Sequence, residues 1–116
     1  MDENRVIQSG AVYWLQPDST RIPHPHVVIY SDASPLVGQV IVCAITTNRR
    51  KISMPANILL EAGEANLPRL SIIEVSKYFM IHQSELGEYI GLLSSRRVEQ
   101  IISGIAFLRT SFGRSS

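Results

Sequence analysis

Residues 38–47 read GQVIVCAITT and form the most strand-like stretch of the chain. β-branched and other apolar residues dominate this stretch, and no proline interrupts it. Further stretches of the same character lie at 10–15, 26–31, 57–60, 71–75, 78–81 and 90–93, of which 71–75 and 78–81 could be one bent strand. Because no helical pattern alternates with these strands, the sequence excludes a doubly wound parallel sheet.

The last part of the chain has a different period. Apolar residues recur there at steps of three and four, the pattern of an amphipathic helix, at Val98, Ile101, Ile102, Ile105, Leu108 and Phe112. Ser94 or Ser95 is a suitable N-cap, and Gly113 is placed to end the helix. We therefore predict a mainly β protein with a C-terminal α-helix, in which a small antiparallel barrel packs against the helix.

Length and composition limit the class of protein. The 116 residues predict one domain over 1–116, with residues 1–9 and 113–116 flexible. No apolar stretch is long enough to cross a bilayer, and the acidic, polar start does not fit a secretory signal. The single cysteine, Cys43, allows no internal disulfide and favours the reducing cytoplasm. A net charge of +1 gives no strong overall field for nucleic acid.

Five segments together resemble the MazF/PemK family of bacterial toxin endoribonucleases. In order, they are GAVYW (10–14), HPHVVIYSD (24–32), GQVIVCAITTN (38–48), PANILLEAGEANLPRLSIIEV (55–75) and LGEYIGLLS (86–94). The resemblance extends over about residues 10–108. It implies an SH3-like barrel that forms a homodimer and cleaves single-stranded RNA without a metal or other cofactor. It also implies a small acidic antitoxin as partner.

The resemblance implies catalytic residues on two strands. Thr46 lies where the family has a catalytic threonine. His24 precedes Pro25 where the family has Arg-Pro, so a principal catalytic arginine is replaced. Arg21, three residues earlier, could supply the lost positive charge.

RNA contacts are expected beside these residues. Thr47, Asn48, Arg49 and Arg50 follow Thr46 in a polar loop of the kind that borders the family's RNA groove. A Gln-x-Arg element of the family falls on Lys77 and Phe79, so the second family arginine is also absent. We expect Lys77 to contact RNA.

Histidine suits this chemistry in part. Metal-free RNA cleavage needs a base for the 2′-hydroxyl proton, a cation for the phosphorane and an acid for the 5′-oxygen, and it leaves a 2′,3′-cyclic phosphate. His24 could transfer protons, because the ordinary pKa of histidine is about 6.5, but arginine is the better phosphate clamp. His26 shares a strand face with His24, and we expect it to be a partly buried packing residue rather than a metal ligand.

Two alternatives remain open from the sequence. Loss of both family arginines is also compatible with a catalytically inactive module that binds RNA or an antitoxin. A toxin with the same barrel and a protein target such as gyrase is the third possibility, although CAITT and LGEYIG resemble the RNA-cleaving branch more closely.

Overall fold

The computed structural model describes residues 7–15, 22–29 and 38–111. Over these residues the chain forms six strands, three 3₁₀ turns and one α-helix. The strands are β1 Ala11–Leu15, β2 His24–Ile29, β3 Gln39–Thr46, β4 Ile58–Leu60, β5 Ser71–His82 and β6 Tyr89–Leu92. The 3₁₀ turns are η2 Arg49–Ser53, η3 Glu64–Asn66 and η4 Gln83–Glu85, and the helix is α1 Ser95–Ser111.

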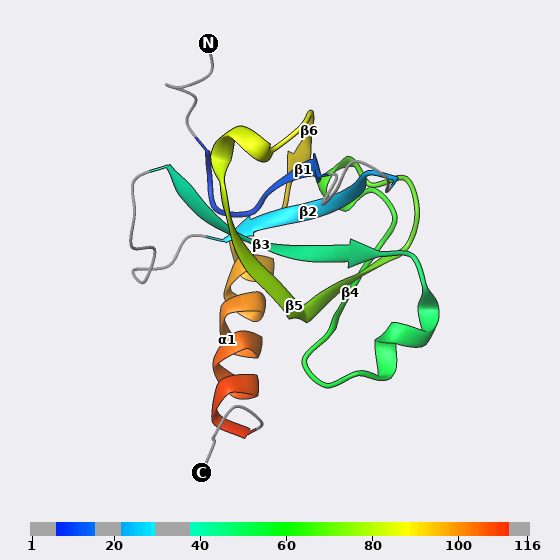
Figure 1. The fold of residues 1–116 in the computed structure, drawn as a ribbon. Helices are drawn as coiled ribbons and strands as arrows, with labels where there is room; N and C mark the ends of the chain where they lie inside the picture. The colour runs from blue at the N-terminus through cyan, green and yellow to red at the C-terminus, as the bar shows by residue number, and fades with distance from the viewer. Residues whose placement is uncertain (1–6, 16–21, 30–37, 112–116) are drawn as a thin grey trace.

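All six strands belong to one antiparallel sheet in the order β4-β5-β3-β2-β1-β6. Figure 1 shows that the sheet curls strongly and that α1 lies against it. The chain between β4 and β5 reaches the other edge of the sheet, where the Asn66 amide donates to the Ile90 carbonyl oxygen of β6 at 2.9 Å. The predicted β fold with a C-terminal helix is confirmed.

β5 is a single strand with a bend, one of the two possibilities that the sequence left open. Its pairing with β3 runs through Glu74↔Ala44, shifts, and resumes at Tyr78↔Cys43. The Asn57 side chain holds the bend, because its oxygen accepts from the Val75 N–H at 3.0 Å and its amide donates to the Lys51 carbonyl oxygen at 2.9 Å. These bonds bring η2 beside the bend.

The central strands bury side chains on both faces, as their continuous apolar runs predict. One face packs with Ile101 of α1 and includes Val27, Cys43 and Ile73. The other face includes Val28 and Val42 in a second buried cluster. Burial raises the pKa of the Cys43 thiol to about 12, so this cysteine behaves as a small apolar core residue.

The helix begins slightly earlier than its apolar stripe suggests. Its first residue is Ser95, and the Arg97 N–H donates to the Ser94 hydroxyl at 3.2 Å, which makes Ser94 the cap. The expected end at Phe112 and Gly113 lies outside the described residues, as do Ser31 and the segments 1–6 and 113–116. None of the described helices is long and apolar enough to span a membrane.

A bidentate ion pair ties the start of α1 to η3. Arg97 Nε lies 2.9 Å from Glu64 Oε1, and Nη2 lies 2.8 Å from Oε2. The hydrogen bonds from Arg97 hold the pKa of Glu64 below its ordinary value of 4.5. Because folding lowers this pKa, the ion pair stabilises the protein at every pH above the ordinary pKa of 4.5. The stabilisation is lost as the pH falls through the pKa that Glu64 has in the folded protein.

We expect Glu64→Gln to lower the free energy of unfolding by about 1 kcal/mol at pH ~7. The difference from wild type should shrink toward pH ~3, because wild-type Glu64 is then increasingly protonated. Urea denaturation at both pH values measures it. Glu99→Gln, at an exposed site on α1, is the matched control and should change stability little at either pH. A difference that does not vary with pH would contradict the assigned charge effect.

Candidate active site

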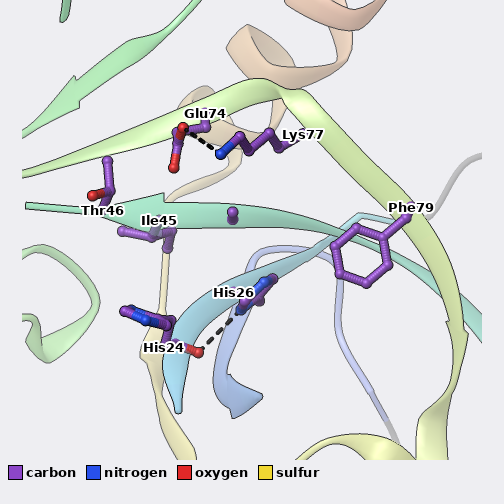
Figure 2. A pocket seen from close by; sticks show the side chains of 8 residues that line it. His24, His26, Ile45, Thr46, Glu74, Lys77 and Phe79 are labelled. Atoms are coloured by element: carbon purple, nitrogen blue, oxygen red, sulfur yellow. Dashed lines mark hydrogen bonds and ion pairs between the residues drawn. The ribbon is translucent and has the colours of Figure 1, made fainter. Parts of the chain in front are cut away.

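An open cavity of about 330 Å³ lies at the junction of β2, β3 and β5. Figure 2 shows its side chains, which come from all three strands. The lining residues are His24, His26, Ala44, Ile45, Thr46, Glu74, Lys77 and Phe79. The structure thus brings together three residues singled out from the sequence, His24, Thr46 and Lys77.

Strand register explains why these residues meet. His26 pairs with Ala44 of β3, and Ala44 pairs with Glu74 of β5, so the three form one row across the sheet. His24 and Thr46 each lie two positions further along antiparallel neighbours and therefore belong to the next row on the same face. Alternation places this face opposite the one that packs against α1. The small side chain of Ala44 leaves room between His26 and Glu74.

His26 is buried, with 3% of its surface exposed, although it lines the cavity. Its Nδ1 lies 3.0 Å from the His24 carbonyl oxygen. A carbonyl oxygen only accepts, so Nδ1 carries the proton and a neutral ring has its lone pair on Nε2. The Phe79 ring packs edge-to-face on the imidazole, with 5.8 Å between the two ring centroids. Burial lowers the pKa of His26 from 6.5, which favours the neutral ring at neutral pH.

His24 and Thr46 are more accessible. His24 is exposed at the start of β2, where Pro25 keeps it extended. The Thr46 hydroxyl oxygen accepts a hydrogen bond from the Asn48 N–H at 3.1 Å, so the hydroxyl does satisfy the loop backbone. The hydroxyl proton is not used in that bond and can be donated to a ligand in the cavity.

Glu74 was not singled out from the sequence as a site residue. Its side chain is 9% exposed and forms ion pairs with Lys77 Nζ at 3.5 Å and Lys51 Nζ at 3.8 Å. Two ammonium groups beside one carboxylate leave this part of the cavity with a positive balance, which suits an anionic ligand. A glutamate within the apolar run SIIEV, at a position that should be buried, was the available signal.

Four candidates among the described residues lie outside the cavity lining. Thr47, Asn48, Arg49 and Arg50 are exposed and follow Thr46 directly. Asn48 caps η2 by accepting from the Arg50 N–H at 3.1 Å, and Arg49 lines a separate cavity of about 220 Å³. Arg21 lies outside the described residues.

Metal ligation was not expected from the sequence. Among residues 7–15, 22–29 and 38–111, no group of three or more histidine, cysteine, aspartate or glutamate side chains is arranged to hold a metal ion.

A curled antiparallel sheet, one C-terminal helix and a cavity across β2, β3 and β5 with histidine, threonine, glutamate and lysine side chains define a small β protein with a candidate active site. The chain matches the family model of the PemK-like, MazF-like toxins of type II toxin–antitoxin systems over residues 8–108, and it belongs to that family. Curated relatives include the endoribonuclease MazF6 of Mycobacterium tuberculosis and the endoribonuclease MazF2 of Mycobacterium bovis. Each is 29% identical over 107 residues, which cover 86% of this chain and 94% of the relative.

Solved structures agree on the fold. A mycobacterial endoribonuclease in complex with its cognate antitoxin superposes with a TM-score of 0.70 at 19% identity, over 96% of this chain and 99% of that one. A MazE–MazF structure from Deinococcus radiodurans gives a TM-score of 0.69 at 15% identity, over 89% and 94%. The family resemblance and the fold class expected from the sequence are confirmed.

Proposed function

We propose that this chain is the toxin of a type II toxin–antitoxin pair and an endoribonuclease that cleaves single-stranded RNA without a metal. The 2′-hydroxyl attacks the adjacent phosphodiester, and the products are a 2′,3′-cyclic phosphate and a 5′-hydroxyl. Family membership and the endoribonuclease relatives support the reaction class. The observation that carries the proposal is that His24 and Thr46, from two strands, line one open cavity.

The cavity offers the groups that this reaction needs. His24 transfers protons, and the Thr46 hydroxyl donates to a non-bridging phosphate oxygen, on which negative charge grows in the transition state. Lys77 supplies positive charge where the family has its Gln-x-Arg element. Thr47, Asn48, Arg49 and Arg50 would hold the neighbouring nucleotides, the arginines through phosphates. Arg21 would supply the positive charge of the missing family arginine to the reacting phosphate.

The partners follow from the same reasoning. RNA and an acidic antitoxin segment both present negative groups to the cavity, so we expect them to compete for it. The cognate complex of the mycobacterial endoribonuclease supports an antitoxin partner. We also expect the chain to act as a homodimer.

The test is cleavage of a single-stranded RNA pool in excess EDTA, with the products analysed for cyclic phosphate ends. Wild type should cleave RNA and leave a strand with 2′-deoxyribose intact, because the nucleophile is then missing. His24→Ala should reduce kcat/KM by about 10²- to 10⁴-fold, the usual contribution of a proton-transferring side chain.

A histidine outside the cavity provides the matched control. His82 is exposed and caps η4, where its side chain accepts from the Ser84 N–H at 3.1 Å. Asparagine is a good cap, so His82→Asn should cleave at the wild-type rate. RNA binding by wild type without any cyclic phosphate product would reject the ribonuclease. It would favour the inactive binding module, for which replacement of both family arginines, by His24 and Phe79, is the supporting observation.

A further inference from the structure

We propose that His26 is a catalytic residue, with Nε2 as the base that takes the 2′-hydroxyl proton, while His24 is the acid for the departing 5′-oxygen. This assignment rests on the ribonuclease function proposed above and divides its proton transfers between two histidines. The family's Arg-Pro motif does not include His26, which follows it on the same strand. The evidence for a catalytic role is the set of contacts that its ring makes in the structure.

The ring is fixed in the tautomer that a base requires. The His24 carbonyl oxygen holds the proton on Nδ1 at 3.0 Å, which leaves the lone pair on Nε2. Phe79 packs edge-to-face against the ring and limits its rotation. A group held in one orientation loses little entropy when it reacts, which is the arrangement expected of a positioned base.

The surroundings keep this ring neutral while an adjacent histidine is exposed. Burial is the largest influence on the pKa of His26 and lowers it, and the charge of His24 lowers it further. The backbone hydrogen bond and Glu74 act in the opposite direction. Two titratable groups whose environments differ in this way are suited to opposite roles, the buried one as base and the exposed one as acid.

The groups that face His26 come from four neighbouring elements. Tyr13 of β1 is its register partner, and Ala44 of β3, on its other side, carries no charge. Across the cavity, β5 contributes Glu74 and Lys77, and η2 contributes Lys51 through its ion pair with Glu74. Glu74 is the one carboxylate among them, and its two lysine partners offset its effect on the imidazole.

The proposed step balances without any co-reactant. The 2′-oxygen forms a bond to phosphorus as its proton moves to His26 Nε2. The bond from phosphorus to the 5′-oxygen breaks, and that oxygen takes a proton from His24. The products are a 2′,3′-cyclic phosphate and a 5′-hydroxyl, with His26 protonated and His24 neutral, and exchange with water restores both.

The decisive variant is His26→Asn. The asparagine amide can donate to the His24 carbonyl oxygen in place of Nδ1, but it has no basic nitrogen. We expect kcat/KM to fall by about 10²- to 10⁴-fold. In wild type, kcat/KM should fall on the acidic side with a pKa below the ordinary histidine value of about 6.5, and His26→Asn should lack this limb. His24→Gln should instead lack the alkaline limb.

A modified substrate separates the two roles. When sulfur replaces the bridging 5′-oxygen, the leaving thiolate needs no proton. This RNA should restore His24→Gln to within about 10-fold of wild type and leave His26→Asn slow. Equal restoration of both variants, or a wild-type rate for His26→Asn on ordinary RNA, would overturn the assignment.

The readouts also separate failure of this inference from failure of the proposed function. If wild type yields no cyclic phosphate, the ribonuclease itself is wrong. If wild type cleaves but its kcat/KM does not fall toward acidic pH anywhere in the range in which the protein stays folded, His26 is not the base, whichever variants fold. Thermal unfolding and binding of an uncleavable 2′-deoxy strand show that each variant is native. His26→Gln serves if His26→Asn does not fold.

Discussion

Gly91→Ala is expected to destabilise the protein by about 3 kcal/mol or more, a large share of the stability typical of a single domain. The reason is steric. A Cβ on Gly91 would overlap the carbonyl oxygen of Ala65 and would lie 2.9 Å from the Ala65 Cα. Backbone rather than a flexible side chain fills that space, so the overlap can be relieved only by separating β6 from η3.

This contact is part of what brings the two ends of the sheet together. Gly91 pairs with Val12 on one side and lies against η3 on the other. Asn66, next to Ala65, donates to the Ile90 carbonyl oxygen at 2.9 Å and holds η3 in place. A shift of η3 would therefore strain a second contact with the same strand.

Urea denaturation of Gly91→Ala and Gly63→Ala measures the effect. Gly63 also belongs to the η3 region, but nothing lies within 4 Å of a Cβ placed there. Its φ of 100° is unfavourable for alanine, so Gly63→Ala should cost only about 1 kcal/mol from backbone strain. Equal destabilisation of the two variants would show that the approach of β6 to η3 is not tight.

The periodicity of apolar residues predicted most of the fold. The run at 38–47 became β3, and the three- and four-residue repeat after Val98 became α1. Two features could not be read in this way. β5 continues through its bend because Asn57 bonds to the Val75 N–H, and this contact joins residues 18 positions apart. The need for glycine at position 91 likewise depends on Ala65, a neighbour only in space.

The sequence predicted the site residues that belong to a family motif. It did not predict those that reach the site only through the pairing of neighbouring strands. The resemblance identified His24 and Thr46, and the structure places both on one cavity. From the sequence we expected His26 only to pack in the strand, because the pattern of apolar residues indicates its burial. The hydrogen bond of its ring to the His24 carbonyl oxygen is visible only in the structure. Glu74 enters the site because Ala44 pairs with both it and His26, which no local pattern encodes.

Thr46→Val should lower kcat/KM for RNA cleavage by about 10²- to 10³-fold, the range for removing one donor to a developing oxyanion. Valine keeps the β-branched shape and so preserves the strand. It removes the hydroxyl that we propose donates to the phosphate in the transition state. RNA affinity should change little, because that bond strengthens only as charge develops.

Thr46→Ser distinguishes the hydroxyl from the shape of the side chain. Serine retains the donor and can still accept from the Asn48 N–H, so most activity should remain. Thr110→Val, at an exposed site on α1, controls for a general effect of replacing threonine with valine. The measurements are single-turnover cleavage and filter binding of a 2′-deoxy strand.

Two results for Thr46→Val carry opposite meanings. Slow cleavage with intact binding supports a hydroxyl that acts on the transition state, because a purely structural loss would weaken both. A wild-type rate would mean that the hydroxyl only holds the loop through Asn48, whose exposed N–H can bond to water in the variant. Lys77 would then be the residue that stabilises the phosphate. Among the described residues that line the cavity, it is the one lysine or arginine.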